Sequence, residues 1–396
     1  MIKNILFITS IFFSSASIAG ALEVTIISAE AEERMNQGQS FAGITVEPDR
    51  PVLRAVELAL FESKTLLQRL GFHDALNTLD IKPDRDLREQ LLAISPSSLV
   101  ILDIPLKTML KVAPILNELK LVSFNVRHSE PTLRNSLCMD YLFHAIPSDH
   151  MYFDALSQFL IYRGWRKVLV VRGPSKKDDA RAETLIVSLK KFGASVVDNR
   201  QFSLSHHPDD RDKNNPEFLT GGASYDVVAV IDSEKDYGRY LQYSTRKARP
   251  VVGDVGLTPK SWHFALERYG APQLNERYRH FKKGDPLSSQ VSMTDKEFAA
   301  WSAVKLVTNS LSTNKKIGTN FDLLNLLKNP QSQVDLYKGT RGSVRLWNHQ
   351  IRQPILLATP DTVVAVAPMP KFLHPKHYVD TLGLDEPESS CQLSKK

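Results

Sequence analysis

The most regular feature of the chain is a series of short apolar runs separated by stretches with helical periodicity. The runs are rich in Val, Ile and Leu, and most lack the strict alternation of a half-exposed strand. Continuous apolar runs are typical of parallel strands covered on both faces. They lie at residues 22–27, 99–104, 121–126, 168–171, 195–197, 227–231 and 251–253. The pattern predicts an α/β fold in which parallel strands alternate with helices.

Three of the predicted helices have recognisable ends. Pro51 begins one that stops at Gly71, since Pro is favoured at helix starts and Gly just past helix ends. Another begins at Ser148, and a third begins where Thr294 and Glu297 have the spacing of a capping box.

The C-terminal part changes character. Residues 342–347, 355–358 and 363–367 are predicted to be short antiparallel strands, and we expect this hairpin to join a sheet edge. The polar segment 203–224 is predicted to be a solvated loop.

The N-terminus has the three parts of a cleavable secretory signal. Lys3 precedes an apolar stretch at residues 5–13, and a run of small residues closes at 19–21. The apolar stretch is shorter than the roughly 20 residues that span a bilayer. We therefore expect residues 1–21 to be a signal peptide on an exported chain.

Length and charge narrow the function. Removing 21 of the 396 residues leaves 396 − 21 = 375, more than one typical domain, so two lobes are expected. Without Lys3 the chain has 49 Lys plus Arg against 44 Asp plus Glu, a net charge of +5. This excess is too small and too dispersed to indicate a nucleic-acid partner, but it permits an anionic small ligand.

Cys138 and Cys391 are the two cysteines of the chain. An oxidising compartment favours a disulfide between them, and the alternative is two free thiols. A bridge would tie the C-terminal tail to the middle of the fold.

Ligands of open parallel sheets bind beyond the carboxyl ends of the strands, so polar residues there are candidate site residues. They are Asp103, Asn125, Arg127, His128, Arg134, Arg172, Lys176, Asp232, Ser233, Tyr237, Asp254 and Trp262. Arg127 and Arg172 would form an anion clamp if they converge, because guanidinium groups bind carboxylates bidentately. The alternative for each arginine is a solvated or structurally paired side chain.

Trp301 has two interpretations. It lies on an apolar helix stripe, where tryptophan usually packs in a core. It could instead be an aromatic platform on which a flat ligand stacks.

Motifs of hydrolases, zinc proteases, P-loops and dinucleotide-binding folds are missing from the sequence, so we expect no enzymatic activity, no metal and no required cofactor.

The chain resembles type I periplasmic substrate-binding proteins of ABC transporters, of the branched-chain amino acid receptor type. The likeness runs through 121–126, 155–171, 225–231, 249–257 and 342–367. It implies two Rossmann-like lobes with parallel sheets, joined by a three-crossover hinge and closing on a small ligand. Lobe 1 would comprise 22–146 plus 257–351, and lobe 2 would comprise 147–256 plus 352–396.

Within that family, the chain is similar to the branch encoded with pyrroloquinoline-quinone (PQQ)-dependent alcohol dehydrogenase systems. The similar segments are 41–48, 133–138, 219–226, 262–275, 352–354 and 380–391. The resemblance implies a monomer in the periplasm that binds a small-molecule ligand and delivers it to an inner-membrane permease. A bridge between Cys138 and Cys391 would then lie near the hinge, because a staple across the cleft mouth would block closure.

The expected ligand is anionic. The loop at 124–128 places Arg127 where amino acid receptors of this type have hydroxyl groups. PQQ is flat and carries three carboxylates, which arginines and one stacking aromatic would suit. The alternatives are a receptor for branched-chain amino acids or short carboxylates, and a periplasmic redox accessory or enzyme.

Overall fold

The computed structural model describes residues 20–29, 49–82, 84–205, 207–281, 292–313 and 322–393. The segment before residue 20 and the segment 41–48 lie outside these ranges. The last two residues of the predicted signal, Gly20 and Ala21, lie within a strand, because β1 spans Gly20–Ser28. The Gly20 N–H donates to the Gly71 carbonyl at 3.0 Å. A cut after Ala21 would therefore remove the first two residues of this strand.

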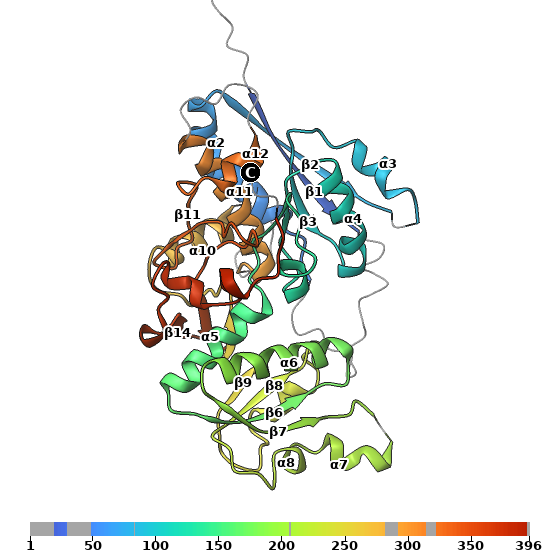
Figure 1. The fold of residues 1–396 in the computed structure, drawn as a ribbon, viewed down its shortest axis with the longest axis vertical. Helices are drawn as coiled ribbons and strands as arrows, with labels where there is room; N and C mark the ends of the chain where they lie inside the picture. The colour runs from blue at the N-terminus through green and yellow to red at the C-terminus, as the bar shows by residue number, and fades with distance from the viewer. Residues whose placement is uncertain are drawn as a thin grey trace, which may run out of the picture.

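Residues 20–144 contain a five-stranded parallel sheet with the order β2-β1-β3-β4-β5, of which β1, β2 and β3 are labelled in Figure 1. Its further strands are β2 (Phe72–Asp80), β3 (Leu99–Asp103), β4 (Ser123–Asn125) and β5 (Leu142–His144). The strands predicted at 22–27, 99–104 and 121–126 are confirmed. Sequence reasoning missed β2, an edge strand whose side chains are mostly exposed, and β5, which has only three residues.

The second sheet is parallel and four-stranded, with the order β7-β6-β8-β9. Its strands are β6 (Lys167–Arg172), β7 (Ser195–Gln201), β8 (Val227–Ile231) and β9 (Val251–Gly253). Every residue of β8 is buried, as its continuous apolar run predicts. All four strands of this sheet are confirmed predictions.

Helices cover both sheets. They are α2 (Leu53–Arg69), α3 (Leu87–Leu92), α4 (Leu106–Glu118), α5 (Asp149–Tyr162), α6 (Lys176–Lys191), α7 (Arg211–Asn214), α8 (Pro216–Leu219), α9 (Gly238–Leu241), α10 (Ala271–His280), α11 (Asp295–Thr313) and α12 (Leu323–Lys328). No helix in the described ranges is long and apolar enough to cross a membrane.

Two of the three predicted helix starts are confirmed, and the third is two residues early, because α2 begins at Leu53 and not at Pro51. Ser148 caps α5 by accepting the Met151 N–H at 3.2 Å. Thr294 and Glu297 form the reciprocal bonds of a capping box at 3.3 and 2.8 Å. The prediction of a loop over 203–224 is only partly right, because α7 and α8 lie within it. Each has four residues, too short to show helical periodicity.

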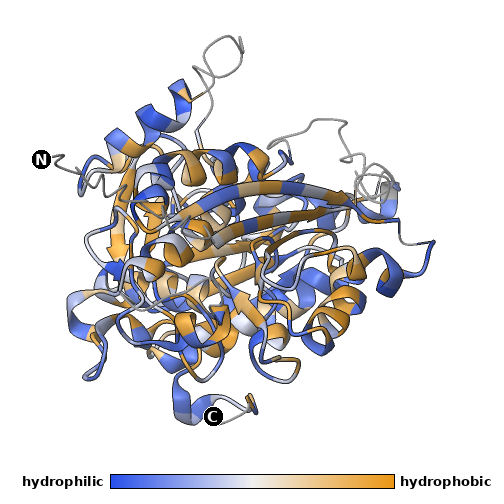
Figure 2. Ribbon diagram, turned by 90° about the horizontal axis from the view of Figure 1, so that it is seen from above, coloured by the Kyte–Doolittle hydropathy of each residue, from blue (hydrophilic) through white to orange (hydrophobic). Residues whose placement is uncertain are grey.

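The apolar interior is divided between the two sheets. Figure 2 shows hydrophobic residues gathered inside and hydrophilic residues on the outer helices. We call the half around the five-stranded sheet lobe 1 and the half around the four-stranded sheet lobe 2. Along the chain, the core residues pass from lobe 1 to lobe 2 between Ile146 and Met151 and return to lobe 1 between Val252 and Trp262. They reach lobe 2 again after Ile351, at a strand whose residues alternate between the two cores. The chain therefore crosses the junction three times.

A third sheet lies at this junction. It is antiparallel and contains β10 (Thr258–Lys260), β13 (Ile355–Ala358) and β14 (Val363–Ala367). Neighbouring side chains of β13 face different cores, since Leu356 packs in lobe 1 whereas Ile355 and Leu357 pack in lobe 2.

The expected hairpin at 355–367 is present, but it does not join an edge of either parallel sheet. Its partner is β10, which belongs to the second crossing and runs antiparallel to β13. The expected strand at 342–347 is largely wrong. Only Gly342 belongs to a strand, β12 (Arg341–Gly342), which pairs with β11 (Val334–Asp335).

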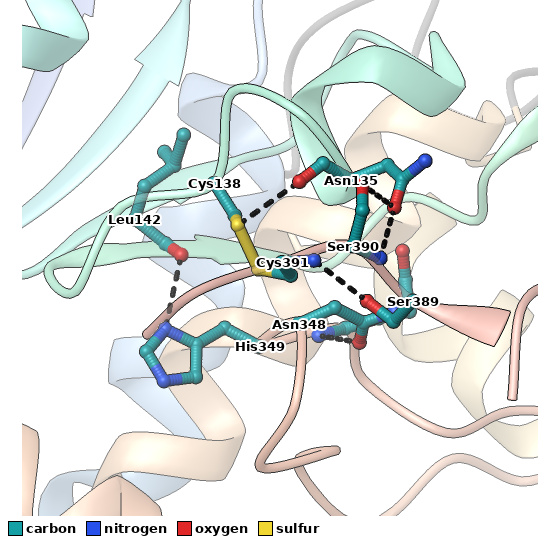
Figure 3. The surroundings of a disulfide bond; sticks show 9 residues. Asn135, Cys138, Leu142, Asn348, His349, Ser389, Ser390 and Cys391 are labelled. Atoms are coloured by element: carbon teal, nitrogen blue, oxygen red, sulfur yellow. Dashed lines mark hydrogen bonds between the residues drawn. A yellow bond between two sulfur atoms is a disulfide. The ribbon is translucent and has the colours of Figure 1, made fainter. Parts of the chain in front are cut away.

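Cys138 and Cys391 form the predicted disulfide (Figure 3), with their Cα atoms 5.7 Å apart. Beside it the Ser390 N–H donates to Asn135 Oδ1 at 2.7 Å. The neighbouring Arg134 donates to the Ile146 carbonyl at 2.8 Å, at the first crossing. The bridge therefore lies near the hinge, as expected.

Replacing both cysteines, as Cys138→Ser with Cys391→Ser, should lower the free energy of unfolding by about 2–4 kcal/mol, because the bridge restricts a long loop of the unfolded chain. Urea denaturation with and without reductant measures the difference. Reductant should destabilise the native chain and leave the double variant unchanged. Equal midpoints for the oxidised native chain and the variant would contradict the prediction.

Candidate functional site

A cavity of about 220 Å³ lies between the lobes, beyond the carboxyl ends of the parallel strands. Lobe 1 contributes the loop after β4 and the start of α11, and lobe 2 contributes α5, α6 and the loops after β8 and β9. The lining residues are Arg127, His128, Ser129, Glu130, Ile146, Asp149, Tyr152, Lys177, Arg181, Asp232, Ser233, Lys235, Asp254, Thr258, Pro259, Lys260 and Asp295.

Asn125 shapes the wall in lobe 1. Its Oδ1 accepts the N–H groups of Arg127 at 3.1 Å and His128 at 2.9 Å, and its Nδ2 donates to the His128 carbonyl at 2.7 Å. These bonds fold the chain sharply after β4. The next residue, Ser129, accepts the Asp149 N–H at 2.8 Å and so connects this loop with α5 in lobe 2.

Arg127 reaches the cavity from this loop, but carboxylates balance its charge. It pairs with Asp49 and, at 3.3 Å, with Asp103. Lys296 contacts the same two carboxylates. Asp103 is buried at the end of β3 and does not line the cavity. It holds the two cations on one side of the cleft.

Arg181 is the corresponding centre in lobe 2. Its guanidinium binds Asp254 bidentately at 2.5 and 2.8 Å and approaches Asp149 at 3.4 Å. Burial raises the pKa of Asp149, and the charge of Arg181 acts against this rise. Both carboxylates therefore depend on one arginine for compensation.

The start of α6 presents a cation without such a partner. Ser175 caps the helix by accepting the Asp178 N–H at 3.0 Å, and Lys177 lies in the first turn, exposed and facing the cavity. No carboxylate of the described ranges lies within 4.0 Å of its ammonium. Asp178 in turn accepts the Ser233 N–H at 2.8 Å and so positions that residue in the cavity wall. A helix N-terminus with an unpaired lysine favours anions.

Arg127, His128 and Asp254 are the predicted site residues that line the cavity, together with Asp232 and Ser233. Arg134 is buried in contacts with Gln350 and the Ile146 carbonyl. The other predicted residues that do not line the cavity are Asp103, Asn125, Arg172, Lys176, Tyr237, Trp262 and Trp301.

The expected convergence of Arg127 and Arg172 is not found. Arg172 pairs with Asp179, within its own lobe. Lys176 is exposed one position before Lys177. Tyr237 stacks on Phe202 in the core of lobe 2.

The two tryptophans are core residues. Trp301 is 0% exposed and donates to Glu62 at 3.1 Å, and Trp262 is 2% exposed and donates to Asn275 at 3.2 Å. Of the two interpretations of Trp301, core packing matches its position. The benzenoid ring that lines the cavity belongs to Tyr152, whose pKa is raised by burial and by Asp295, so its hydroxyl keeps its proton.

Sequence reasoning missed several lining residues, most of all Lys177 and Arg181. The start of α6 could have indicated them, because Ser175 is a preferred N-cap and Ala182, Leu185 and Leu189 form a buried helical stripe. Within the part of the chain that the structure describes, no group of three or more His, Cys, Asp or Glu residues could hold a metal ion.

Solved structures that share this architecture include several described as periplasmic binding proteins. A branched-chain amino acid ABC transporter periplasmic ligand-binding protein from Burkholderia xenovorans is 12% identical, with a TM-score of 0.67 over 94% of this chain and 100% of that chain. A leucine-, isoleucine-, valine-, threonine- and alanine-binding protein from Brucella ovis is 14% identical, with a TM-score of 0.64 over 96% and 100%. An R. palustris solute-binding protein in complex with benzoate is 13% identical, with a TM-score of 0.60 over 94% and 100%.

At these identities the likeness establishes the fold, which is that of type I periplasmic binding proteins, and it confirms the predicted α/β class with two parallel sheets. No family model matches the sequence. No curated protein matches it either.

The charge compensation in lobe 2 can be tested through stability. Arg181→Met should lower the free energy of unfolding at about pH 7.5 by about 3–5 kcal/mol, because it leaves the buried carboxylate of Asp149 and the partly buried carboxylate of Asp254 without their cation. The loss should be smaller at about pH 5. Removing the arginine raises the pKa of Asp149 further above its unfolded value, so the folded variant gains stability as protons bind.

Arg172→Met is the matched control, because its partner Asp179 is half-exposed and such pairs contribute less than about 1 kcal/mol. Urea denaturation at both pH values measures both variants. Equal losses in the two variants would show that Arg181 does not carry the compensation.

Proposed function

We propose that the protein is the periplasmic solute-binding component of an ABC transport system and binds a small anionic ligand between its lobes. One observation carries the proposal: the interlobe cavity contains Lys177 at the N-terminus of α6, a lysine with no carboxylate partner among the residues that the structure describes. The fold supports it, because solved structures that share this architecture include solute-binding proteins. Closure around the ligand would create the form that a permease recognises.

PQQ is the finer proposal for the ligand. Its three carboxylates could meet Lys177 from lobe 2, Arg127 from lobe 1 and Lys260 from the second crossing. The ring of Tyr152 offers an apolar contact for a flat molecule. The cavity of about 220 Å³ is smaller than the ~300–1,000 Å³ of typical ligand pockets, so PQQ would require a wider opening of the lobes than this structure has.

The small volume favours a second candidate, a receptor for amino acids or short carboxylates. Asp149 and Asp232 also line the cavity, and acidic groups could accept the ammonium of an amino acid. One structural neighbour is named as a leucine-, isoleucine-, valine-, threonine- and alanine-binding protein, and another is described in complex with benzoate. The two candidates share the capture of a carboxylate and differ in ligand size.

Isothermal titration with PQQ, leucine and benzoate separates the candidates. The ligand that binds should lose about tenfold in affinity, about 1.4 kcal/mol, in Lys177→Ala, because one charge-assisted contact is removed. Lys176→Ala is the matched control, an exposed lysine one position away that does not line the cavity. Equal losses in the two variants would contradict the placement of the ligand at α6. No binding of any carboxylate would contradict the proposed function.

A further inference from the structure

Lys338 is a buried lysine outside the cavity. It lies in the turn between β11 and β12, is 2% exposed, and its ammonium donates to three oxygen atoms. These are the carbonyl oxygen of Ser261 at 2.9 Å, Oε1 of Gln353 at 2.7 Å and the carbonyl oxygen of Pro354 at 2.9 Å. An ammonium has three N–H donors, so each acceptor receives one.

The three acceptors belong to segments that cross between the lobes. Ser261 follows β10 in the second crossing, and Gln353 and Pro354 precede β13 in the third. Gln353 also connects Lys338 with the first crossing, because its Nε2 donates a hydrogen bond to the Ala145 carbonyl at 2.7 Å. One charged group and one amide thus connect all three crossings.

The turn that carries Lys338 is fixed within lobe 1. Tyr337 and Gly339 have left-handed backbone angles, with φ of 54° and 80°, and the Tyr337 N–H donates to Asp335 Oδ1 at 2.8 Å. A Cβ at Gly339 would lie 2.8 Å from the ring of Tyr269, so glycine is required there. The lysine is therefore held by a defined turn.

Asp295 is the charged group that acts on Lys338. Its Oδ1 accepts the N–H groups of Ser261 and Trp262, and its other oxygen lies 4.0 Å from Lys260. The ring of Phe298 covers the ammonium at 4.9 Å. Burial lowers the pKa of Lys338 to about 7, against the attraction of Asp295. When the Lys338 ammonium loses a proton, the neutral amine has two N–H donors for three acceptors, and its nitrogen lone pair faces one of the three oxygen atoms.

We propose that Lys338 is a proton-dependent lock on the hinge: protonated, it ties the three crossings together, and deprotonated, it releases them so that the lobes sample a wider range of openings. The proposal rests on the interlobe closure of the proposed function but concerns its control, not the ligand.

The distribution of distances between the lobes tests this proposal on the chain without ligand. Spin labels attached at Lys111→Cys on α4 and Glu183→Cys on α6 measure the distance between the lobes, and both positions are exposed. The distribution should be narrow at about pH 5.5 and wider at about pH 8.5, on either side of the pKa of Lys338. Lys338→Met should give the wide distribution at both pH values.

Lys305→Met is the matched control, because Lys305 is another lysine whose pKa burial lowers, but it contacts Ser63 and Glu62 within lobe 1. It should keep the native pH response. Gln353→Leu should widen the distribution at both pH values, because it removes the amide that binds the Ala145 carbonyl and also removes one of the three acceptors of Lys338. A native distribution that does not change with pH, or a Lys338→Met variant with the native response, would overturn the proposal.

Melting curves separate hinge release from loss of the fold. The folded chain releases the Lys338 proton near pH 7, whereas the unfolded chain holds it to about pH 10.5. The contribution of Lys338 to the free energy of unfolding therefore rises with pH in this window. Above pH 7, the melting temperature of the native chain should therefore rise relative to that of Lys338→Met, while the distance distribution of the native chain widens. A melting point of the native chain that falls relative to Lys338→Met over the same range would indicate general loosening and refute the lock. Because no ligand is used, these outcomes do not depend on which solute binds.

Discussion

The junction between the lobes is the constraint on which the rest of the structure depends. Three segments of the chain cross this junction. Where they cross, their backbone carbonyls lie outside the parallel sheets and so do not receive hydrogen bonds from a neighbouring strand of those sheets. Buried carbonyls need donors, and each one left unsatisfied costs about 1–3 kcal/mol. The donors are side chains: Gln350 donates to the carbonyls of His144 and Ile146, and Gln353 and Lys338 serve the other crossings. The polar character of this interior follows from its position between two apolar cores.

Charge pairing in the cavity follows the same division. Arg181 is compensated by Asp149 and Asp254 within lobe 2, and Arg127 is compensated by Asp49 and Asp103 within lobe 1. Because each of these charge clusters belongs to one lobe, widening the cavity does not separate Arg181 or Arg127 from its carboxylates. An ion pair across the cleft would instead resist opening. The arrangement is compatible with the closure that we propose.

Much of the architecture could be predicted because its causes are local. Strands such as β8 are buried on both faces, so they have a continuous apolar run, and helix starts such as Ser148 and Thr294 are marked by their own caps. The missed strand β2 lies at an edge, where exposure removes the apolar signal. The hairpin partner β10 was missed because only three residues pair, and they lie far from β13 in the chain.

The sequence by itself determined the alternation of buried strands with capped helices and the α/β class, because these depend on periodicity, capping and residue type within short windows. The tertiary structure decided which charges face the cavity. Successive helical residues point about 100° apart, so the docking of α6 turns Lys177 and not Lys176 into the cavity. It also buried Trp301 in the core and paired Arg172 with Asp179, away from Arg127. Those outcomes depend on packing between segments distant in the chain, about which a local pattern carries no information.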